Sequence, residues 1–343
     1  MFRRWVLLIS GLILYSQLAP AENPPATESA PRAKVVIEEE RGATDAFRPD
    51  LAKVRIMLQE GITSLTGKAT AVEAWKSLVT TQDVVGIKVC STPGPNSGTR
   101  PAVVEAVVQG LLEAGLPPKH VLIWDRQLTD LRLAGFGELA KHYGVRLAGS
   151  VQTGFDPKVF YDTALLGSLV WGDLEFGKKG PGIGRKSYVS KILTHDVTKI
   201  ININPLLNHN IAGVFGHLYG LAIGSVDNVL RFESDPDRLA TAVPEIYALT
   251  NLTDHVVLNV TDALICQYEG GERGLLHYSA TLNQLRFSRD AVALDVLSIQ
   301  ELERQRKAAN APEVKPNLEL YNNAALLELG VSNTNRIDIQ YGR

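Results

Sequence analysis

The sequence predicts an α/β protein with a mainly parallel, mixed sheet and helices on both faces. Short runs rich in Val and Ile alternate with amphipathic segments along most of the 343-residue chain. Several of these runs are apolar at nearly every position, as in strands that are buried on both faces. With 45% hydrophobic residues and a net charge of −2, the chain is long enough to bury a substantial core.

The individual elements follow from these patterns and from the residues at their boundaries. Thr70 and Glu73 form a capping box, Thr99 is expected to cap the helix that contains Pro101, and Asp290 is expected to cap a long helix. The expected strands are residues 34–37, 84–90, 120–124, 145–148, 199–205, 255–260, 282–287 and 337–341. The expected helices are residues 49–65, 70–78, 99–115, 128–143, 235–247, 290–309 and 317–329. Residues 149–186 show neither the pattern of a strand nor that of an amphipathic helix.

The N-terminus has the pattern of a secretory signal peptide. Arg3 and Arg4 precede an apolar run, and Ala19-Pro20-Ala21 fits a cleavage site. The apolar run is short for a membrane-spanning helix, although an uncleaved anchor is the alternative. The arginine pair also occurs in twin-arginine signals, but the residues that follow fit general secretion better.

We therefore expect a signal peptide over residues 1–21, a linker over 22–33 and a single α/β domain over 34–343. The protein is expected to be periplasmic or secreted, with no membrane span after cleavage. The near-zero net charge and the scattered Lys and Arg residues do not indicate a nucleic-acid partner.

The two cysteines, Cys90 and Cys266, each follow a strand-like run. If these strands are neighbours, the thiols could pair in an oxidising compartment; otherwise they are separate buried thiols. Two cysteines are too few to hold an iron–sulfur cluster.

A basic, glycine-rich segment occupies residues 177–186. Glycines of this kind can turn backbone N–H groups toward a phosphate. However, no strand directly precedes the segment and its spacing matches neither common nucleotide-binding motif, which favours an ordinary flexible loop.

The most site-like stretch is Asn208-His209-Asn210, which follows the expected strand 199–205. In open α/β sheets, ligands bind outside the carboxyl ends of the strands. Other polar residues follow strands that would end at the same edge, among them Asp125 with Arg126. The candidate catalytic residues are His209, Asp262, Glu269 and Asp295, and the candidate substrate-binding residues are Lys88, Asn208, Asn210 and Arg126.

Such a cluster is suited to acid–base chemistry or to a divalent metal, although no metal-ligand spacing in the sequence is diagnostic. Each residue also has a structural interpretation. Lys88 would then pair with a carboxylate, Asp262 would start a turn, and His209 would only be hydrogen-bonded.

The sequence resembles a family catalogued as domain of unknown function 362, over residues 84–331. The resemblance implies an α/β fold and, in many relatives, an export signal, but no agreed activity. Some relatives carry a ferredoxin-like cluster module that this chain lacks. The matching pieces are Val85-Gly86-Ile87-Lys88, Pro101-Ala102-Val103-Val104, residues 199–205, residues 209–214, Gly224-Ser225-Val226-Asp227-Asn228, Asp262 with Tyr268-Glu269-Gly270-Gly271, residues 290–295, Leu318-Glu319-Leu320 and Leu329-Gly330-Val331.

The chain departs from the family pattern at three places: Asn208, Tyr219-Gly220 and Asp290-Ala291. The first two departures remove charge next to the expected site. Two functions therefore remain open. The first is an exported enzyme acting on a small polar or anionic substrate. The second is a non-catalytic binding or accessory protein of the cell envelope, which Asn208 and Tyr219 favour.

Overall fold

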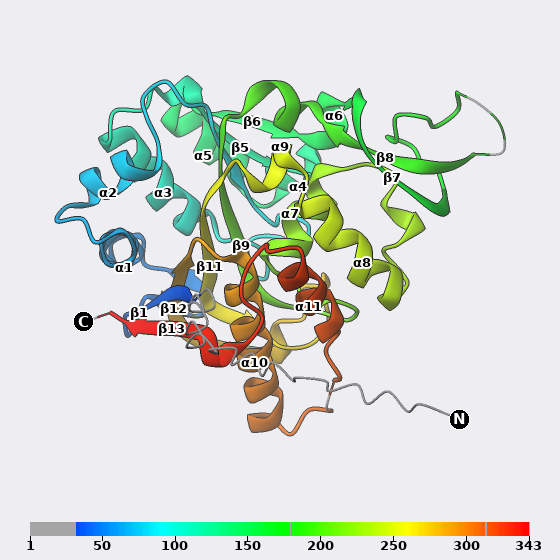
Figure 1. Ribbon diagram of the computed structural model, residues 1–343. Helices are drawn as coiled ribbons and strands as arrows, with labels where there is room; N and C mark the ends of the chain where they lie inside the picture. Colours follow the sequence, from blue (N-terminus) through cyan, green and yellow to red (C-terminus); the bar gives the residue numbers. More distant parts are fainter. Residues whose placement is uncertain (1–31, 179, 181, 313, 343) are drawn as a thin grey trace, which may run out of the picture. The chain divides into compact units, whose positions relative to one another are not determined.

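The computed structural model describes residues 32–342 apart from positions 179, 181 and 313. The expected signal peptide and almost all of the expected linker lie outside the described residues. The described residues belong to one compact unit, Arg32–Arg343, which is built around a central sheet (Figure 1). Its first strand, β1, begins at Ala33, the last residue of the expected linker.

The elements alternate along the chain as the hydrophobic pattern indicates. The strands are β1 Ala33–Glu39, β2 Thr44–Asp45, β3 Arg48–Pro49, β4 Val85–Lys88, β5 Val121–Asp125, β6 Arg146–Gly149, β7 Phe155–Ser168, β8 Ile183–Ser190, β9 Lys199–His209, β10 Gly213–Val214, β11 Val256–Gln267, β12 Ser279–Ser288 and β13 Ile337–Tyr341. The α-helices are α1 Leu51–Thr66, α2 Ala71–Leu78, α3 Pro101–Glu113, α4 Leu128–Leu133, α5 Phe136–Tyr143, α6 Ser150–Thr153, α7 His217–Ser225, α8 Pro236–Tyr247, α9 Thr250–Thr253, α10 Ala291–Ala308 and α11 Leu318–Leu326.

The central sheet has the strand order β13-β1-β12-β11-β9-β4-β5-β6, and β10 pairs with β9. β12 runs antiparallel to both of its neighbours, and β10 runs antiparallel to β9. The other neighbouring strands are parallel. The expected mainly parallel, mixed sheet is therefore confirmed.

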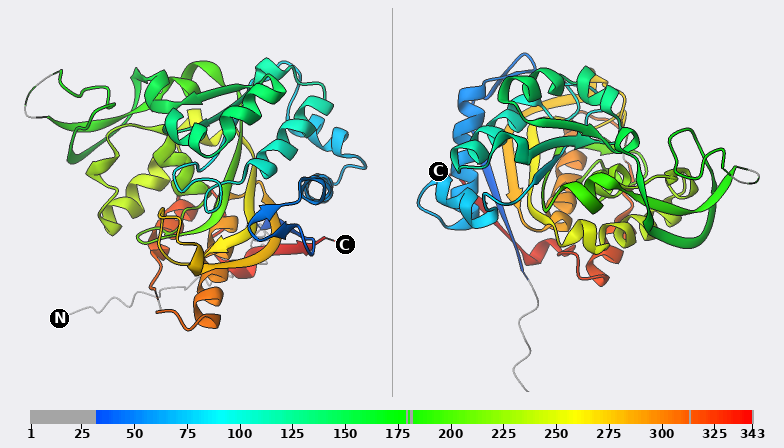
Figure 2. Two further views of the ribbon diagram at one scale, coloured as in Figure 1. Left: turned by 180° about the vertical axis from the view of Figure 1, so that it is seen from behind. Right: turned by 90° about the horizontal axis from the view of Figure 1, so that it is seen from above.

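Helices cover both faces of this sheet (Figure 2). Because side chains alternate along a strand, each buried strand contributes to two cores. In β5, Val121 and Ile123 belong to the core formed with α1, α2, α3 and α5. Leu122 and Trp124 belong to the core formed with α7, α8, α10 and α11.

The strand order reverses direction between β4 and β9. From β4 the chain adds β5 and then β6 on one side, and it later places β9 and β11 on the other side of β4. Connections that diverge from such a point leave a crevice outside the carboxyl ends of the two strands, where open α/β proteins usually bind ligands.

Three elements differ from the sequence-based expectations. The expected helix over 128–143 is broken at Gly135, whose φ of 94° is left-handed, and becomes α4 and α5. Thr99 does not cap α3: its hydroxyl donates to the Ile203 carbonyl (2.8 Å), and Arg100 precedes the helix. Residues 149–186 contain α6 and most of the β7–β8 hairpin, which extends from the body of the molecule (Figure 1).

The strand expected to end at Pro205 continues as β9 to His209. β9 pairs with β4 only as far as Asn202, opposite Lys88. Pro205 therefore lies beyond the part of β9 that pairs with β4. Because no β4 residue is paired there, the N–H that proline lacks is not needed for a hydrogen bond to β4. As a result Asn208 and His209 lie within a strand that pairs with β10, rather than in a loop after the strand.

The thiols of Cys90 and Cys266 are both free and buried. Cys266 lies in β11 and Cys90 follows β4, and β9 separates these two strands. The two cysteines are therefore not on neighbouring strands, as a disulfide between them would require. In the described part of the chain, no helix has the length and apolar character needed to cross a membrane.

Candidate functional site

A buried ion pair joins the carboxyl ends of β4 and β5. Lys88 pairs in register with Trp124, so the next residue of β5, Asp125, reaches the lysine. Nζ of Lys88 lies 2.8 Å from Oδ1 of Asp125 and donates to the Val89 carbonyl at 2.6 Å. Lys88 has no exposed surface and Asp125 is 6% exposed. A buried lysine with a paired carboxylate avoids most of the cost of an isolated buried charge.

The other contacts of Asp125 hold the carboxylate in one orientation. Oδ2 accepts from the backbone N–H (2.8 Å) and hydroxyl (2.7 Å) of Ser91, and Oδ1 also accepts from the N–H of Arg126 (2.8 Å). The loop after β4 and the loop after β5 are thus joined through one carboxylate.

Helix α7 lies directly on this pair because its glycines allow a very close approach. A Cβ at Gly224 would lie 2.3 Å from Cε of Lys88, and one at Gly220 would lie 2.6 Å from Oδ1 of Asn204. A Cβ at Gly216 would lie 2.2 Å from Oδ1 of Asp295. These glycines recur every four residues, so one face of α7 packs against polar groups rather than apolar ones.

A cavity of about 260 Å³ lies above the ion pair, at the reversal point of the strand order. Asp125 and Thr92 contribute from the β4–β5 side, and Gly220 and Gly224 from α7. Its remaining lining residues are Arg126, Gln127, Asp130, Val170, Phe215, Ile223, Val229, Leu230, Glu233 and Glu272. We call this space the carboxyl-edge cavity.

The charged lining of the carboxyl-edge cavity is mostly acidic. Among the described lining residues, Asp125, Asp130, Glu233 and Glu272 contribute carboxylates and Arg126 contributes a guanidinium. Loss of solvent raises the pKa of Glu272, and the nearby carboxylates of Glu233 and Asp125 raise it further. Loss of solvent and Asp125 likewise raise the pKa of Asp130.

The guanidinium of Arg126 is partly used within the protein. Its Nη1 donates to the carbonyls of Ile223 (3.1 Å) and Val226 (3.4 Å) at the end of α7. A cation at a helix C-terminus also offsets the negative end of the helix dipole. Arg126 therefore positions α7 over the cavity as well as lining it.

The His209 side chain is held by the backbone after its own strand. Nδ1 accepts from the N–H groups of Ala212 (2.9 Å) and Ile211 (3.2 Å), so the ring proton must reside on Nε2. The ring packs on Tyr219, with centroids 4.2 Å apart. Burial lowers the pKa of His209 to about 4, so the ring is neutral at pH 7.

Tyr219 connects His209 to the carboxyl-edge cavity. Its hydroxyl donates to Oε1 of Glu233 (2.9 Å), which lines the cavity. His209 does not line the cavity, and it is connected to it through this tyrosine and through Phe215, a lining residue whose ring centroid lies 6.4 Å from that of His209. Its two neighbours in sequence bond to each other, from Asn208 Nδ2 to Asn210 Oδ1 (3.1 Å), and Asn208 Oδ1 accepts from the N–H of Gly271 (2.9 Å).

Asp262 lies in a separate buried ion pair with Arg100. The carboxylate accepts from the backbone N–H and from Nη1 of Arg100, both at 2.9 Å. Arg100 is 1% exposed and Asp262 is fully buried. The pair ties the start of α3 to the middle of β11, and it does not line the carboxyl-edge cavity.

Asp295 caps α7 from the neighbouring helix α10. It accepts from the N–H groups of His217 (2.7 Å) and Leu218 (3.0 Å). Burial raises the pKa of Asp295 to about 7. Glu269 has a different partner again, with Oε2 at 3.6 Å from Nε of Arg306.

The candidate residues thus fall into separate groups. Lys88 and Arg126 both contact Asp125, and of these three only Asp125 and Arg126 line the carboxyl-edge cavity. His209, Asp262, Asp295 and Glu269 are each engaged by a different partner. In the described part of the chain, no group of three His, Cys, Asp or Glu side chains is arranged to hold a metal ion.

The family model described as Domain of unknown function (DUF362) matches residues 85–300, more than half of the chain. The chain belongs to the DUF362 family. The matched region contains β4, β5, β9 and α7, together with every described residue that lines the carboxyl-edge cavity.

A crystal structure of a Thermotoga maritima protein, solved by a structural genomics consortium, is similar to this DUF362 protein. The identity is 12%, the TM-score is 0.41, and the match covers 78% of this chain and 61% of that chain. The chain therefore spans about three fifths of that protein's length. Comparison with curated proteins gave no match.

A layer of buried asparagines lies under α7 in this DUF362 protein, and the sequence analysis did not predict it. Asn202 Nδ2 donates to the His217 carbonyl (3.0 Å) and contacts Asn259 Oδ1 (3.2 Å), while Asn204 Nδ2 donates to Asn202 Oδ1 (2.7 Å). The signal was present in the alternation of Asn with Ile in residues 201–204, which indicates a strand with one polar face. No sequence pattern indicated that Glu233 and Glu272 line the carboxyl-edge cavity, because both residues lie in loops and loops have no periodic pattern.

Proposed function

We propose that this DUF362 protein binds a small polar ligand in the carboxyl-edge cavity. The observation that carries the proposal is the position of this cavity. It lies at the reversal of the strand order and directly above the buried Lys88–Asp125 pair. Pockets of this kind, concave and lined by a few fixed polar groups, are the usual ligand sites of open α/β folds.

The lining favours a ligand with a positively charged group over the anionic substrate that the sequence suggested. Lys88 already neutralises Asp125, but among the described lining residues Asp130, Glu233 and Glu272 still outnumber the guanidinium of Arg126, which already donates to two carbonyls. An amine would gain charge-assisted hydrogen bonds from these carboxylates. A hydrated divalent cation is also positively charged, and it is the second class of ligand that these carboxylates could attract.

A binding role agrees best with how the candidate catalytic residues are used. His209 accepts two backbone hydrogen bonds through Nδ1, Asp262 pairs with Arg100, and Asp295 caps α7. None of these three groups lines the carboxyl-edge cavity, so none is placed to exchange a proton with a ligand bound there.

An enzymatic role is the second candidate, and one specific observation favours it. The pKa values of Glu272 and Asp130 are both raised, and both residues line the same cavity. Carboxylates with raised pKa values in a cleft are typical of general acids and bases.

The test is calorimetric titration of the purified protein with 1,4-diaminobutane, Mg²⁺ and succinate in parallel. We expect the diamine or the metal ion to bind, succinate not to bind, and Glu233→Gln and Glu272→Gln each to weaken binding about tenfold. Glu138→Gln, an exposed change in α5, is the matched control. Binding of succinate alone, lost in Arg126→Gln, would refute the cationic preference. Mass spectrometry of the recovered diamine separates binding from turnover.

We also propose that the protein is exported, on the basis of Arg3, Arg4, the apolar run that follows and the Ala19-Pro20-Ala21 site. Expression in a Gram-negative host should yield a periplasmic or secreted product whose first residue is Glu22. A cytoplasmic product that retains Met1 would contradict this, and an uncleaved membrane-bound product would support the anchor alternative. Arg3→Lys with Arg4→Lys should block export only if the twin-arginine route is used.

A further inference from the structure

The acidic lining of the carboxyl-edge cavity comes partly from loops. Asp125 belongs to β5 and Asp130 to α4, whereas Glu233 and Glu272 lie outside the helices and strands. Loss of solvent raises the pKa of Glu272, and the carboxylates of Glu233 and Asp125 raise it further. Because like charges repel, loops that bring carboxylates together must be held in place by other contacts.

Asn208 holds the loop that carries Glu272. In the described part of the chain, no hydrogen-bond donor contacts the Glu272 carboxylate, so the backbone of the loop determines where it lies. Oδ1 of Asn208 accepts from the N–H of Gly271, the preceding residue, at 2.9 Å. Nδ2 of Asn208 donates to Oδ1 of Asn210 (3.1 Å), which fixes the orientation of the Asn208 amide.

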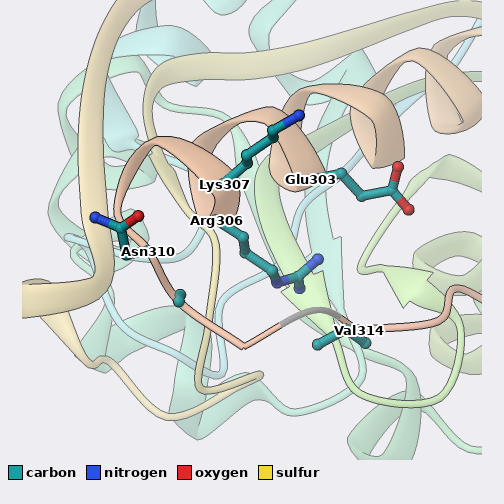
Figure 3. A pocket seen from close by; sticks show the side chains of 6 residues that line it. Glu303, Arg306, Lys307, Asn310 and Val314 are labelled. Carbon is teal, nitrogen blue, oxygen red and sulfur yellow. The ribbon is translucent and has the colours of Figure 1, made fainter.

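Two further side chains anchor the same loop. Nε2 of Gln267 donates to the carbonyls of Gly271 and Arg273, both at 3.0 Å, on either side of the acidic residue. Earlier in the loop, Oε2 of Glu269 lies 3.6 Å from Nε of Arg306. Figure 3 shows Arg306 extending from α10. The loop is therefore tied to β9, to β11 and to α10.

His209 holds Glu233 through the ring of Tyr219. The Tyr219 hydroxyl donates to Oε1 of Glu233 at 2.9 Å. The Tyr219 ring packs on His209 and on Phe215, with centroid distances of 4.2 Å and 5.1 Å. The imidazole is itself fixed, because Nδ1 accepts from two backbone N–H groups. Loss of the imidazole would let the tyrosine move, and Glu233 would lose a fixed donor.

We propose that Asn208 and His209 are positioning residues, which hold Glu272 and Glu233 where a cation bound in the carboxyl-edge cavity needs them. The two residues are consecutive at the end of β9, so one strand end sets the positions of both loop carboxylates. This role rests on the proposed binding of a cation in the cavity. It gives the polar stretch after Pro205 a function without requiring that it contact the ligand.

The test is a set of double-mutant cycles, measured by calorimetric titration of the purified protein with 1,4-diaminobutane, or with Mg²⁺ if only the metal ion binds the wild type. Asn208→Ala and His209→Asn should each weaken binding about fivefold. In the Glu272→Gln background, Asn208→Ala should change the affinity by less than about twofold, because the carboxylate that it positions is already lost. His209→Asn should likewise have little further effect in the Glu233→Gln background.

The crossed pairs are the controls. Asn208→Ala should keep its effect of about fivefold in the Glu233→Gln background, because the two residues are not linked. Asn323→Ala removes a side-chain bond to the Ala240 carbonyl (3.1 Å) outside the cavity lining and should leave binding unchanged. Asn208→Ser and Tyr219→Phe are the milder alternatives if Asn208→Ala or His209→Asn does not fold.

Two results would overturn the proposal and leave the proposed function intact. The first is equal binding by wild type, Asn208→Ala and His209→Asn, although Glu233→Gln and Glu272→Gln weaken binding. The second is a full, additive loss in the matched double variants, because Asn208 and His209 would then not act through these carboxylates. A wild-type protein that binds neither probe would refute the proposed function, and this role with it.

Discussion

Asp262 holds Arg100 through both of its carboxylate oxygens, with the backbone N–H at 2.9 Å from Oδ2 and Nη1 at 2.9 Å from Oδ1. The same guanidinium donates through Nη2 to the carbonyls of Asn96 (2.9 Å) and Ile265 (3.2 Å). A side chain that the sequence presented as a candidate catalyst is thus the centre of a buried link between α3 and β11.

Asp262→Asn should destabilise the protein strongly. The change keeps the size of the side chain but leaves a buried guanidinium without its counter-charge, which costs about 3–5 kcal/mol of unfolding free energy. Urea denaturation measures the effect. Asp338→Asn is the control, because Asp338 pairs with Arg32 at the surface and should cost less than about 1 kcal/mol. Similar stabilities for the two variants would mean that the Arg100–Asp262 pair contributes little to folding, and a functional role for Asp262 would then be favoured.

His209→Asn should change the dependence of stability on pH. The pKa of His209 is about 4 in the folded protein and 6.5 without burial. The unfolded state therefore binds more protons between these values. This contribution to stability is complete above pH 6.5 and is lost as the pH falls toward 4. It amounts to about 3 kcal/mol at most.

Asparagine at position 209 can still accept the backbone hydrogen bonds but does not titrate. We expect the variant to be less stable at pH 7.5, because the packing on Tyr219 is lost, and the difference from wild type to shrink as the pH falls. Denaturant unfolding at several pH values measures this. Parallel stability curves for the two proteins would mean that the ring titrates normally.

Gly224→Ala should destabilise the protein although alanine favours helices. The added methyl group would lie 2.3 Å from Cε of Lys88 and would push α7 away from the Lys88–Asp125 pair. Overpacking of this kind costs about 1–3 kcal/mol. Gly137→Ala in α5 is the matched control, since its nearest neighbour is 3.6 Å away and the change should be neutral or stabilising by up to about 1 kcal/mol. Equal thermal midpoints for the two variants would argue against close packing of α7.

The thiols of Cys90 and Cys266 should remain unpaired in protein purified without reductant. Their strands are separated by β9, and two strand spacings amount to roughly 9–10 Å, beyond the span of a disulfide. Burial also raises the pKa of both thiols. A thiol reagent should therefore label neither cysteine in the native protein and both after unfolding. An unfolded, unreduced protein that shows no free thiol would reveal a disulfide.

The sequence by itself determined the fold class, the family and most of the elements. These follow from local periodicity and boundary residues: Thr70 with Glu73 caps α2, Asp290 caps α10, and apolar runs form β4, β5, β9 and β11. Hydrophobic burial acts on each segment separately, so a short window of residues contains the information.

Only the tertiary structure decided which polar residues share a partner. Lys88 meets Asp125 because β4 and β5 pair in one particular register, while Asp262 meets Arg100, 162 positions away. Acidic, basic and amide groups pair with whichever complementary group the packing brings near, and a sequence of this length offers many. The glycine face of α7 and the ion pair between Arg306 and Glu269 are likewise properties of packed neighbours, so they became visible only once the strands and helices were placed together.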